Sequence, residues 1–397
     1  MKELLYNIYR ETNIIYRKKE ISTNNCVISY EHGARVEIIG DTLAEYRVEF
    51  INRDTNIIEY STIIYNKSRF ESGIKYYINW GIKVYENGEL VAENNFDLKG
   101  QNVVIRIDSS ALGDNIAWIP YVEEFRKKHE CNVYVTTFYN DLFKGRYPKL
   151  KLGNPGTGFE NVYAQYNLGW YYKLNNVIDF NKNRIDPKLY PLQETASIIL
   201  GLEYKEIIPK VIYPNKVPNF YDKYVVIAPH GSAQAKYWNA VGGWQTVIDY
   251  LNSIGYKVIL IGIERLGDPI HDFKLGGSLT NVIDKTGNIP IQDRVIDIKY
   301  ASLFIGLGSG LSWLSWSLGT KTILISGFSE KNTEFSDCVR IGTTEKYSCS
   351  GCFNINRLMP GNFNWCPQHE NTSRMFECTK TIKPETVITE INKILLP

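Results

Sequence analysis

The chain has 397 residues, of which 44% are hydrophobic and 22% are charged, and its formal net charge is +2. This composition predicts a globular protein of two or three domains. Basic and acidic residues are interleaved and form no basic run, which argues against nucleic-acid binding. No apolar run approaches the roughly 20 residues that cross a bilayer, and residues 1–19 lack the features of a signal peptide. We therefore expect a cytoplasmic protein that neither binds nucleic acid nor inserts into a membrane.

Residues 1–98 predict a small antiparallel β domain. Apolar and polar residues alternate in stretches such as "YRVEFIN" and "KYYINWGIKVYENGELVAENNFDL". Turn signals separate these stretches, namely Glu-His-Gly at 31–33 and Glu-Asn-Gly at 86–88. This pattern is typical of hairpins.

Two α/β blocks follow, at 99–215 and from 216 onward. In the first, "NVVIRIDSSALGDNIAWIPYVEEFRKKHECNVYVTTF" has the order strand, loop, amphipathic helix, strand, which is a βαβ unit. The second repeats this order from "YVVIAPHGSAQAKYWN" to "LFIGLGSGLSWLSWSLGTKTILISG", and "KPETVITEINKILL" adds a closing helix. We predict two Rossmann-like domains, 99–215 and 216–397, that face each other across a cleft and bind ligands at the carboxyl ends of their strands.

Asp114 is the first candidate catalytic residue. It follows a predicted strand and precedes a helix in "SSALGDNIAW", where a side chain at the strand end points into the cleft. Capping of the helix is the alternative, because aspartate readily accepts the unpaired N–H groups at a helix start. No Ser-His-Asp triad can be assembled from the five scattered histidines.

A second group of candidates would bind an anion. The turn "IGLGSGLSW" leads from a strand into a helix through Gly308, Ser309, Gly310 and Leu311, and such a turn offers N–H groups and a favourable helix dipole to a phosphate. Its spacing fits neither the dinucleotide fingerprint nor a P-loop, and glycines also serve tight packing. Lys236 could neutralise a diphosphate, or be a solvated charge, and Arg294 could clamp phosphate or sugar, or pair with Asp293.

Four of the seven cysteines, Cys349, Cys352, Cys366 and Cys378, lie within residues 348–379. The spacing is C-x2-C, then 13 residues, then Cys, then 11 residues, then Cys. Reduced thiols in the cytoplasm favour a metal over disulfides, and four thiolates suit a closed structural site for zinc or iron. A thioredoxin-like redox role is the weaker alternative, since "CSGC" does not join a strand to a helix.

These stretches resemble the bacterial autotransporter heptosyltransferases. The resemblance rests on "GDNIAWIPYVEEF" at 113–125, "QAKYWN" at 234–239, "GLGSGLSWLSW" at 306–316, "ISGFSEKNTEF" at 325–335 and the cysteine segment, and it spans nearly the whole chain. The resemblance implies a GT-B fold with an added N-terminal β domain, an iron held by the four cysteines, and a homo-oligomer, of which a dodecamer is the best-known form. It also implies ADP-heptose as donor and serines of an autotransporter adhesin passenger as acceptors.

By the same resemblance, Asp114 is the catalytic base, Lys236 and residues 309–311 bind the diphosphate, and Arg294 lies at the sugar-nucleotide site. One carboxylate acting opposite the leaving group implies inversion at the sugar. Gly308 departs from the family pattern, which has proline there. The alternatives are a transferase that uses a hexose donor or acts on lipopolysaccharide or another glycan, and a non-catalytic, metal-stabilised binding protein.

Overall fold

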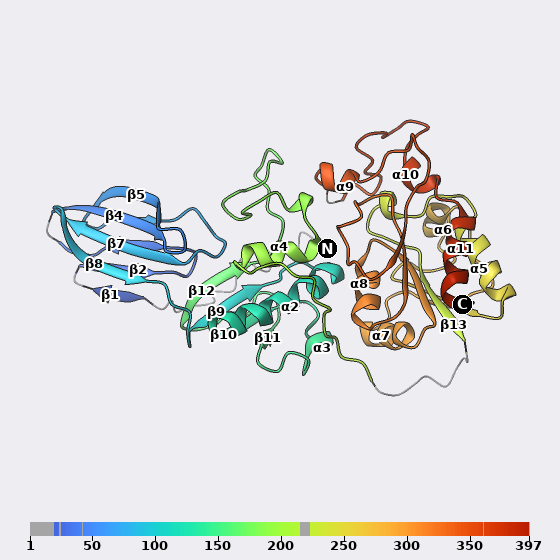
Figure 1. Cartoon of the computed structure of the whole chain (residues 1–397), viewed down its shortest axis with the longest axis horizontal. Helices are drawn as coiled ribbons and strands as arrows, with labels where there is room; N and C mark the ends of the chain where they lie inside the picture. Colours follow the sequence, from blue (N-terminus) through green and yellow to red (C-terminus); the bar gives the residue numbers. More distant parts are fainter. Residues whose placement is uncertain (1–19, 24, 42, 215–222, 360, 397) are drawn as a thin grey trace.

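The structure is a computed structural model that describes residues 20–23, 25–41, 43–214, 223–359 and 361–396. Three parts follow one another along the longest axis of the molecule (Figure 1). Antiparallel sheets come first, then a four-stranded parallel sheet, then a six-stranded parallel sheet. The predicted fold class is therefore confirmed, with two doubly wound parts after an antiparallel one.

The N-terminal part consists of two antiparallel sheets. In sheet order their strands are β1 (Ile21–Thr23), β2 (Cys26–Ser29), β3 (Arg35–Ile38) and β6 (Arg69–Glu71), then β5 (Ile57–Tyr65), β4 (Glu45–Asn52), β7 (Trp80–Glu86) and β8 (Glu89–Asn95). Phe50 of β4 stacks on Phe70 of β6 with ring centroids 4.9 Å apart, so the two sheets share a core. The β7–β8 turn requires positive φ, which Asn87 (49°) and Gly88 (93°) supply.

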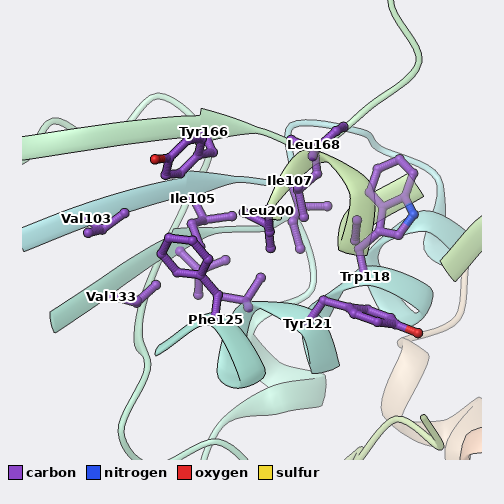
Figure 2. Close-up of a cluster of buried hydrophobic side chains, with 14 of the residues drawn as sticks. Val103, Ile105, Ile107, Trp118, Tyr121, Phe125, Val133, Tyr166, Leu168 and Leu200 are labelled. Atoms are coloured by element: carbon purple, nitrogen blue, oxygen red, sulfur yellow. The ribbon is translucent and has the colours of Figure 1, made fainter. Parts of the chain in front are cut away.

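The first parallel sheet has the order β11-β10-β9-β12. Its strands and helices are β9 (Asn102–Arg106), α2 (Leu112–His129), β10 (Asn132–Thr136), α3 (Asn140–Phe143), β11 (Lys151–Gly153), β12 (Val162–Asn167), a 3₁₀ turn (Pro187–Leu189) and α4 (Leu192–Ile199). Figure 2 shows the core, in which Phe125 of α2 faces the sheet. Trp118 and Tyr121 of the same helix donate hydrogen bonds to Leu192 and Gln193 at the start of α4. The predicted βαβ unit is therefore confirmed as β9-α2-β10.

The second parallel sheet has the order β15-β14-β13-β16-β17-β18. Its strands are β13 (Tyr224–Ala228), β14 (Lys257–Gly262), β15 (Ile283–Thr286), β16 (Leu303–Leu307), β17 (Thr322–Ile325) and β18 (Val339–Ile341). Its helical elements are a 3₁₀ turn (Gln234–Lys236), α5 (Gly243–Ser253), α6 (Pro269–Leu275), α7 (Ile291–Lys299), α8 (Gly310–Ser317), α9 (Cys352–Ile355), α10 (Glu377–Lys380) and α11 (Pro384–Leu395).

The two parallel-sheet parts meet where the starts of α2 and α8 cross. A Cβ placed on Gly310 would lie 2.7 Å from Cβ of Leu112 and 2.9 Å from the backbone nitrogen of Gly113. A Cβ on Gly113 would lie 3.5 Å from Cα of Gly310. Only glycine allows this approach, because any side chain at 310 would force the helices apart.

The domain limits 1–98, 99–215 and 216–397 stay predictions. The sheets change between residues 95 and 102, while residues 1–19 and the limit at 215/216 lie outside the described residues. Within the part of the chain that the structure describes, no helix has the length and apolar character needed to cross a membrane.

Candidate active site and metal centre

A cavity of about 650 Å³ lies at the carboxyl ends of β9, β13, β14 and β16, between the two parallel-sheet parts. All seven residues that the sequence analysis assigned to catalysis and donor binding line it. They are Asp114, Lys236, Arg294, Gly308, Ser309, Gly310 and Leu311. Folding therefore brings together residues that are as far as 197 positions apart in the sequence, the difference between 114 and 311.

Asp114 does not cap its helix. It lies in the first turn of α2, whose N-cap is Ala111, and Oγ of Ser109 donates a hydrogen bond to its Oδ2 at 2.6 Å. Burial raises the pKa of the Asp114 carboxyl, while the Ser109 hydrogen bond and the charge of Lys236 lower it. The capping alternative is therefore wrong, and the carboxylate is left to face the cavity.

Asn115 fixes the loop that carries Ser109. Its amide nitrogen donates to the carbonyl oxygens of Ser109 at 2.7 Å and of Ala111 at 2.8 Å. Its Oδ1 accepts a hydrogen bond from Thr137 at 2.6 Å. The sequence analysis missed Ser109 and Asn115, although a serine followed by a helix start is a detectable signal.

Lys236 ends a 3₁₀ turn after β13 and points toward the same cavity. Burial lowers the pKa of its ammonium group, and the negative charges of Asp114 and Glu334 raise it. The charge of Lys236 therefore lies close enough to interact with carboxylates from both parts. Its neighbours Tyr237 and Trp238 are each 1% exposed, so they pack in the core.

The glycine turn joins the end of β16 to the start of α8. Ser309 is the N-cap residue with extended backbone, and α8 begins at Gly310. The first N–H groups of a helix have no partner within the helix, and here they begin at the cavity wall. The turn thus has the geometry of an anion site at a helix N-terminus.

The guanidinium of Arg294 is hydrogen-bonded to backbone carbonyl oxygens of the protein. It donates to the carbonyl oxygens of Gly262 at 3.2 Å and Gly287 at 3.1 Å, and also to that of Lys285. The side chain is 4% exposed. These contacts support a role in holding the loops after β14 and β15, and direct contact with a donor stays a prediction.

Further polar residues line the cavity and were missed by the sequence analysis, among them one histidine and two glutamates. His230 follows β13, Glu264 follows β14, and Glu334 lies between β17 and β18. Within the described residues, neither ring nitrogen of His230 has a hydrogen-bond partner, and burial lowers its pKa to about 4. A strand-end search would have found the first two, whereas Glu334 lies nine residues beyond its strand.

The four cysteines of residues 348–379 converge. Burial, with smaller effects of Cys349 and Cys366, raises the pKa of the Cys352 thiol to about 11. Burial also raises the pKa of Cys378, and the other three cysteines add to this effect. Four thiols in one segment, with no disulfide among the described residues, have the chemistry of a zinc or iron donor set. The ligand atoms that lie within 4.8 Å of one another are those of Cys349, His369 and Glu377, so the four-cysteine set stays a prediction.

His369 and Glu377 lie beside this cluster. A ring nitrogen of His369, a carboxylate oxygen of Glu377 and Sγ of Cys349 all lie within 4.8 Å of one another. Glu377 also accepts a hydrogen bond from the backbone N–H of Cys349 at 2.9 Å. The pKa of its carboxyl is lowered to about 2, mainly by hydrogen bonds from Arg374. Because its carboxylate is already bound, we assign Glu377 to the support of Cys349. Both residues were missed, although each stands within three positions of a cysteine.

Comparisons with known proteins agree on a family. Residues 203–355 match Glycosyltransferase family 9 (heptosyltransferase). The chain is 33% identical over 384 residues to the autotransporter heptosyltransferase TibC of Escherichia coli O78:H11, which covers 93% of this chain and 90% of TibC. It is 32% identical over 366 residues to the autotransporter heptosyltransferase BAHTCr of Citrobacter rodentium, which covers 90% of this chain and 86% of that protein.

The fold agrees as well. Crystal structures of TibC, described as an iron-containing dodecameric glycosyltransferase, superpose with a TM-score of 0.85 at 31% identity over 95% of this chain and 97% of TibC. One of them is a complex with ADP-D-beta-D-heptose. The resemblance seen in the sequence is confirmed: the chain is a glycosyltransferase and belongs to the family of autotransporter heptosyltransferases.

Proposed function

We propose that this protein transfers heptose from ADP-heptose to serine hydroxyls of an autotransporter adhesin passenger. The observation that carries the proposal is the cavity, in which the carboxylate of Asp114 from one part faces Lys236 and the start of α8 from the other. The relatives named for heptose transfer, and the TibC complex with ADP-D-beta-D-heptose, support the choice of donor.

The lining of the cavity contains two chemically different groups of residues. His230 and Glu264, whose side chains approach each other to 4.0 Å, form one group with the segment 287–291, and we assign this group to the nucleoside. Asp114, Glu334 and Phe353 belong to the other group, which we assign to the sugar. A diphosphate held by Lys236 and residues 308–311 would join the two.

In the proposed reaction, Asp114 accepts the proton of the serine hydroxyl as the serine oxygen attacks the anomeric carbon. The bond from that carbon to the diphosphate breaks, and ADP leaves with the electron pair. Lys236 and the N–H groups at the start of α8 stabilise the charge that develops on the diphosphate. Attack from the opposite face inverts the anomeric centre, so a β-linked donor gives an α-linked product.

We assign an iron, or alternatively zinc, to Cys349, Cys352, Cys366 and Cys378. Such a closed thiolate site cross-links a segment and leaves no position for substrate. The buried cluster of this segment contains Trp365 and Phe376, and Ala235 and Phe328 from outside the segment pack against them. The four side chains would therefore hold residues 348–379 in place beside the cavity.

We further propose a cytoplasmic homo-oligomer. The described residues lack a helix that could span a membrane, and TibC is described as dodecameric. Strand β5 lies at the edge of its sheet and exposes Ile57, Ile58, Ile63 and Tyr65 by half or more. An exposed apolar edge strand of this kind suits contact with other subunits.

The test of the proposed function is transfer in vitro. Purified enzyme is incubated with ADP-heptose and a purified passenger, and intact-mass analysis then reads the added mass. We expect additions of whole heptose units, located on serines by peptide fragmentation. Addition of hexose alone, or transfer to lipopolysaccharide but not to the passenger, would overturn the proposal.

The pH dependence of kcat/KM is expected to be bell-shaped. The base works only when ionised, so activity falls as pH drops through the raised pKa of Asp114, at a higher pH than for an ordinary aspartate. Lys236 works only when protonated, so activity falls again as pH rises through its lowered pKa. Initial rates at limiting ADP-heptose measure this profile. An acid limb at ordinary aspartate pKa would contradict the role of Asp114.

A further inference from the structure

The cavity contains a buried carboxylate that the proposed mechanism does not use. Glu334 is 8% exposed and lines the cavity from the loop between β17 and β18. Its Oε1 accepts a hydrogen bond from Oγ of Ser329 at 2.8 Å, and its Oε2 forms an ion pair with Arg340. Arg340 also donates to the carbonyl oxygen of Ser329 at 2.5 Å, so the loop holds this carboxylate in one position.

Gly308 makes room for this carboxylate. A Cβ placed on Gly308 would lie 2.5 Å from Oε1 of Glu334, closer than two such atoms can stand. The acidic group therefore occupies the place that a side chain of the glycine turn would fill. It reaches the wall of the cavity beside the glycine turn.

The charges around Glu334 indicate what it can bind. A phosphate is excluded as a direct partner, because two anions would repel each other at hydrogen-bond distance. Arg340 neutralises the carboxylate but takes up only part of its capacity, since two carboxylate oxygens offer about four acceptor positions. The remaining positions suit a neutral group that donates hydrogen bonds.

Hydroxyl groups of a sugar are such donors. Glu334 lines the same cavity as Asp114 and lies beside Gly308, so we assign it to the sugar rather than to the nucleoside. Phe328 and Phe353, whose ring centroids lie 4.9 Å apart, also line the cavity and offer apolar surface to the carbon face of a sugar.

We propose that Glu334 determines donor specificity by accepting hydrogen bonds from hydroxyl groups of the transferred sugar. This inference rests on the proposed function and adds to it a residue that recognises the sugar rather than the nucleotide. Gly308 and Arg340 assist it, the first by leaving space and the second by balancing the charge.

The test compares two ligands that share ADP. KM is measured for ADP-heptose, and the inhibition constant is measured for ADP, which lacks the sugar. For Glu334→Gln we expect KM to rise about 10- to 100-fold, because a charged acceptor is lost. The inhibition constant of ADP should stay within about twofold. Glu390→Gln on α11 is the matched control, since its carboxylate pairs with Lys393 far along the chain from the cavity.

Glu334→Asp separates recognition from a purely electrostatic role. Aspartate keeps the charge and the ion pair, which protects folding, but withdraws the oxygens from the sugar. We expect KM for ADP-heptose to rise in this variant too, with ADP inhibition unchanged. If Glu334 only maintains the charge of Lys236, Glu334→Asp will behave as wild type and Glu334→Gln will weaken ADP and ADP-heptose in parallel.

The outcomes for the two proposals differ. A wild-type enzyme that neither transfers heptose nor is inhibited by ADP contradicts the proposed function. If the wild type is active and the Glu334 variants keep the wild-type KM for ADP-heptose, only the specificity role is overturned. The same holds if these variants lose affinity for ADP by the same factor as for ADP-heptose.

Discussion

Replacing Asp114 with asparagine is expected to lower kcat by about 10²- to 10⁴-fold, the usual contribution of a general base. Asparagine has nearly the same shape, and its amide oxygen can still accept the hydrogen bond that Oγ of Ser109 donates at 2.6 Å. The loop 109–111 should therefore keep its conformation. What is lost is a group that can take the serine proton.

The measurement is kcat for passenger glycosylation, with the inhibition constant of ADP recorded beside it. Since Asp114 comes from the part opposite the glycine turn, ADP should bind to the variant as to wild type. Asp141→Asn, an exposed aspartate in the first turn of α3, is the matched control and should keep full activity. A fully active Asp114→Asn enzyme would show that another group is the base.

Cys378→Ser is expected to abolish stable metal binding and to release residues 348–379 from the body of the protein. Structural thiolate sites contribute folding free energy directly, and a hydroxyl is a poor replacement for a thiolate ligand. The loss should be large because Cys378 is 6% exposed and packs against Gly327, where a Cβ would meet its carbonyl oxygen. Its displacement therefore disturbs the loop that carries Glu334 as well.

Elemental analysis measures the amount of bound metal. Limited proteolysis measures whether residues 348–379 are released from the body of the protein. We expect early cleavage within 348–379, a lower Tm and loss of transfer. Cys338→Ser is the matched control, because Cys338 lies outside the cluster and its thiol donates to the carbonyl oxygen of Phe335. Retention of stoichiometric iron or zinc in Cys378→Ser would contradict the four-cysteine assignment.

The parallel sheets and their order in the chain were predictable because local patterns encode them. β9-α2-β10 and β13-α5-β14 alternate buried apolar strands with helices, and the carboxyl ends of parallel strands always meet at one edge. Asp114, Lys236 and the glycine turn each follow such a strand. The convergence of Lys236 and the glycine turn therefore follows from the topology of one sheet, whereas Asp114 joins them because the two parts meet at the starts of α2 and α8.

Other features depend on contacts that no local pattern encodes. Glu334 reaches the cavity only through the path of the loop between β17 and β18 and its ion pair with Arg340. His369 and Glu377 approach Cys349 only once the cysteine segment has folded. Arg294 has the residue type of a phosphate clamp, yet three backbone carbonyls take up its donors. Such residues become visible when side-chain partners are known.

The contact between Gly113 and Gly310 has a consequence for turnover. If the two parts separate to release the nucleotide, they must come together again before the next transfer. The closed arrangement is then defined by the contact between the backbones of Gly113 and Gly310, which does not depend on side-chain rotamers. The spacing between the base Asp114 and the diphosphate site at the start of α8 would then be the same in every cycle.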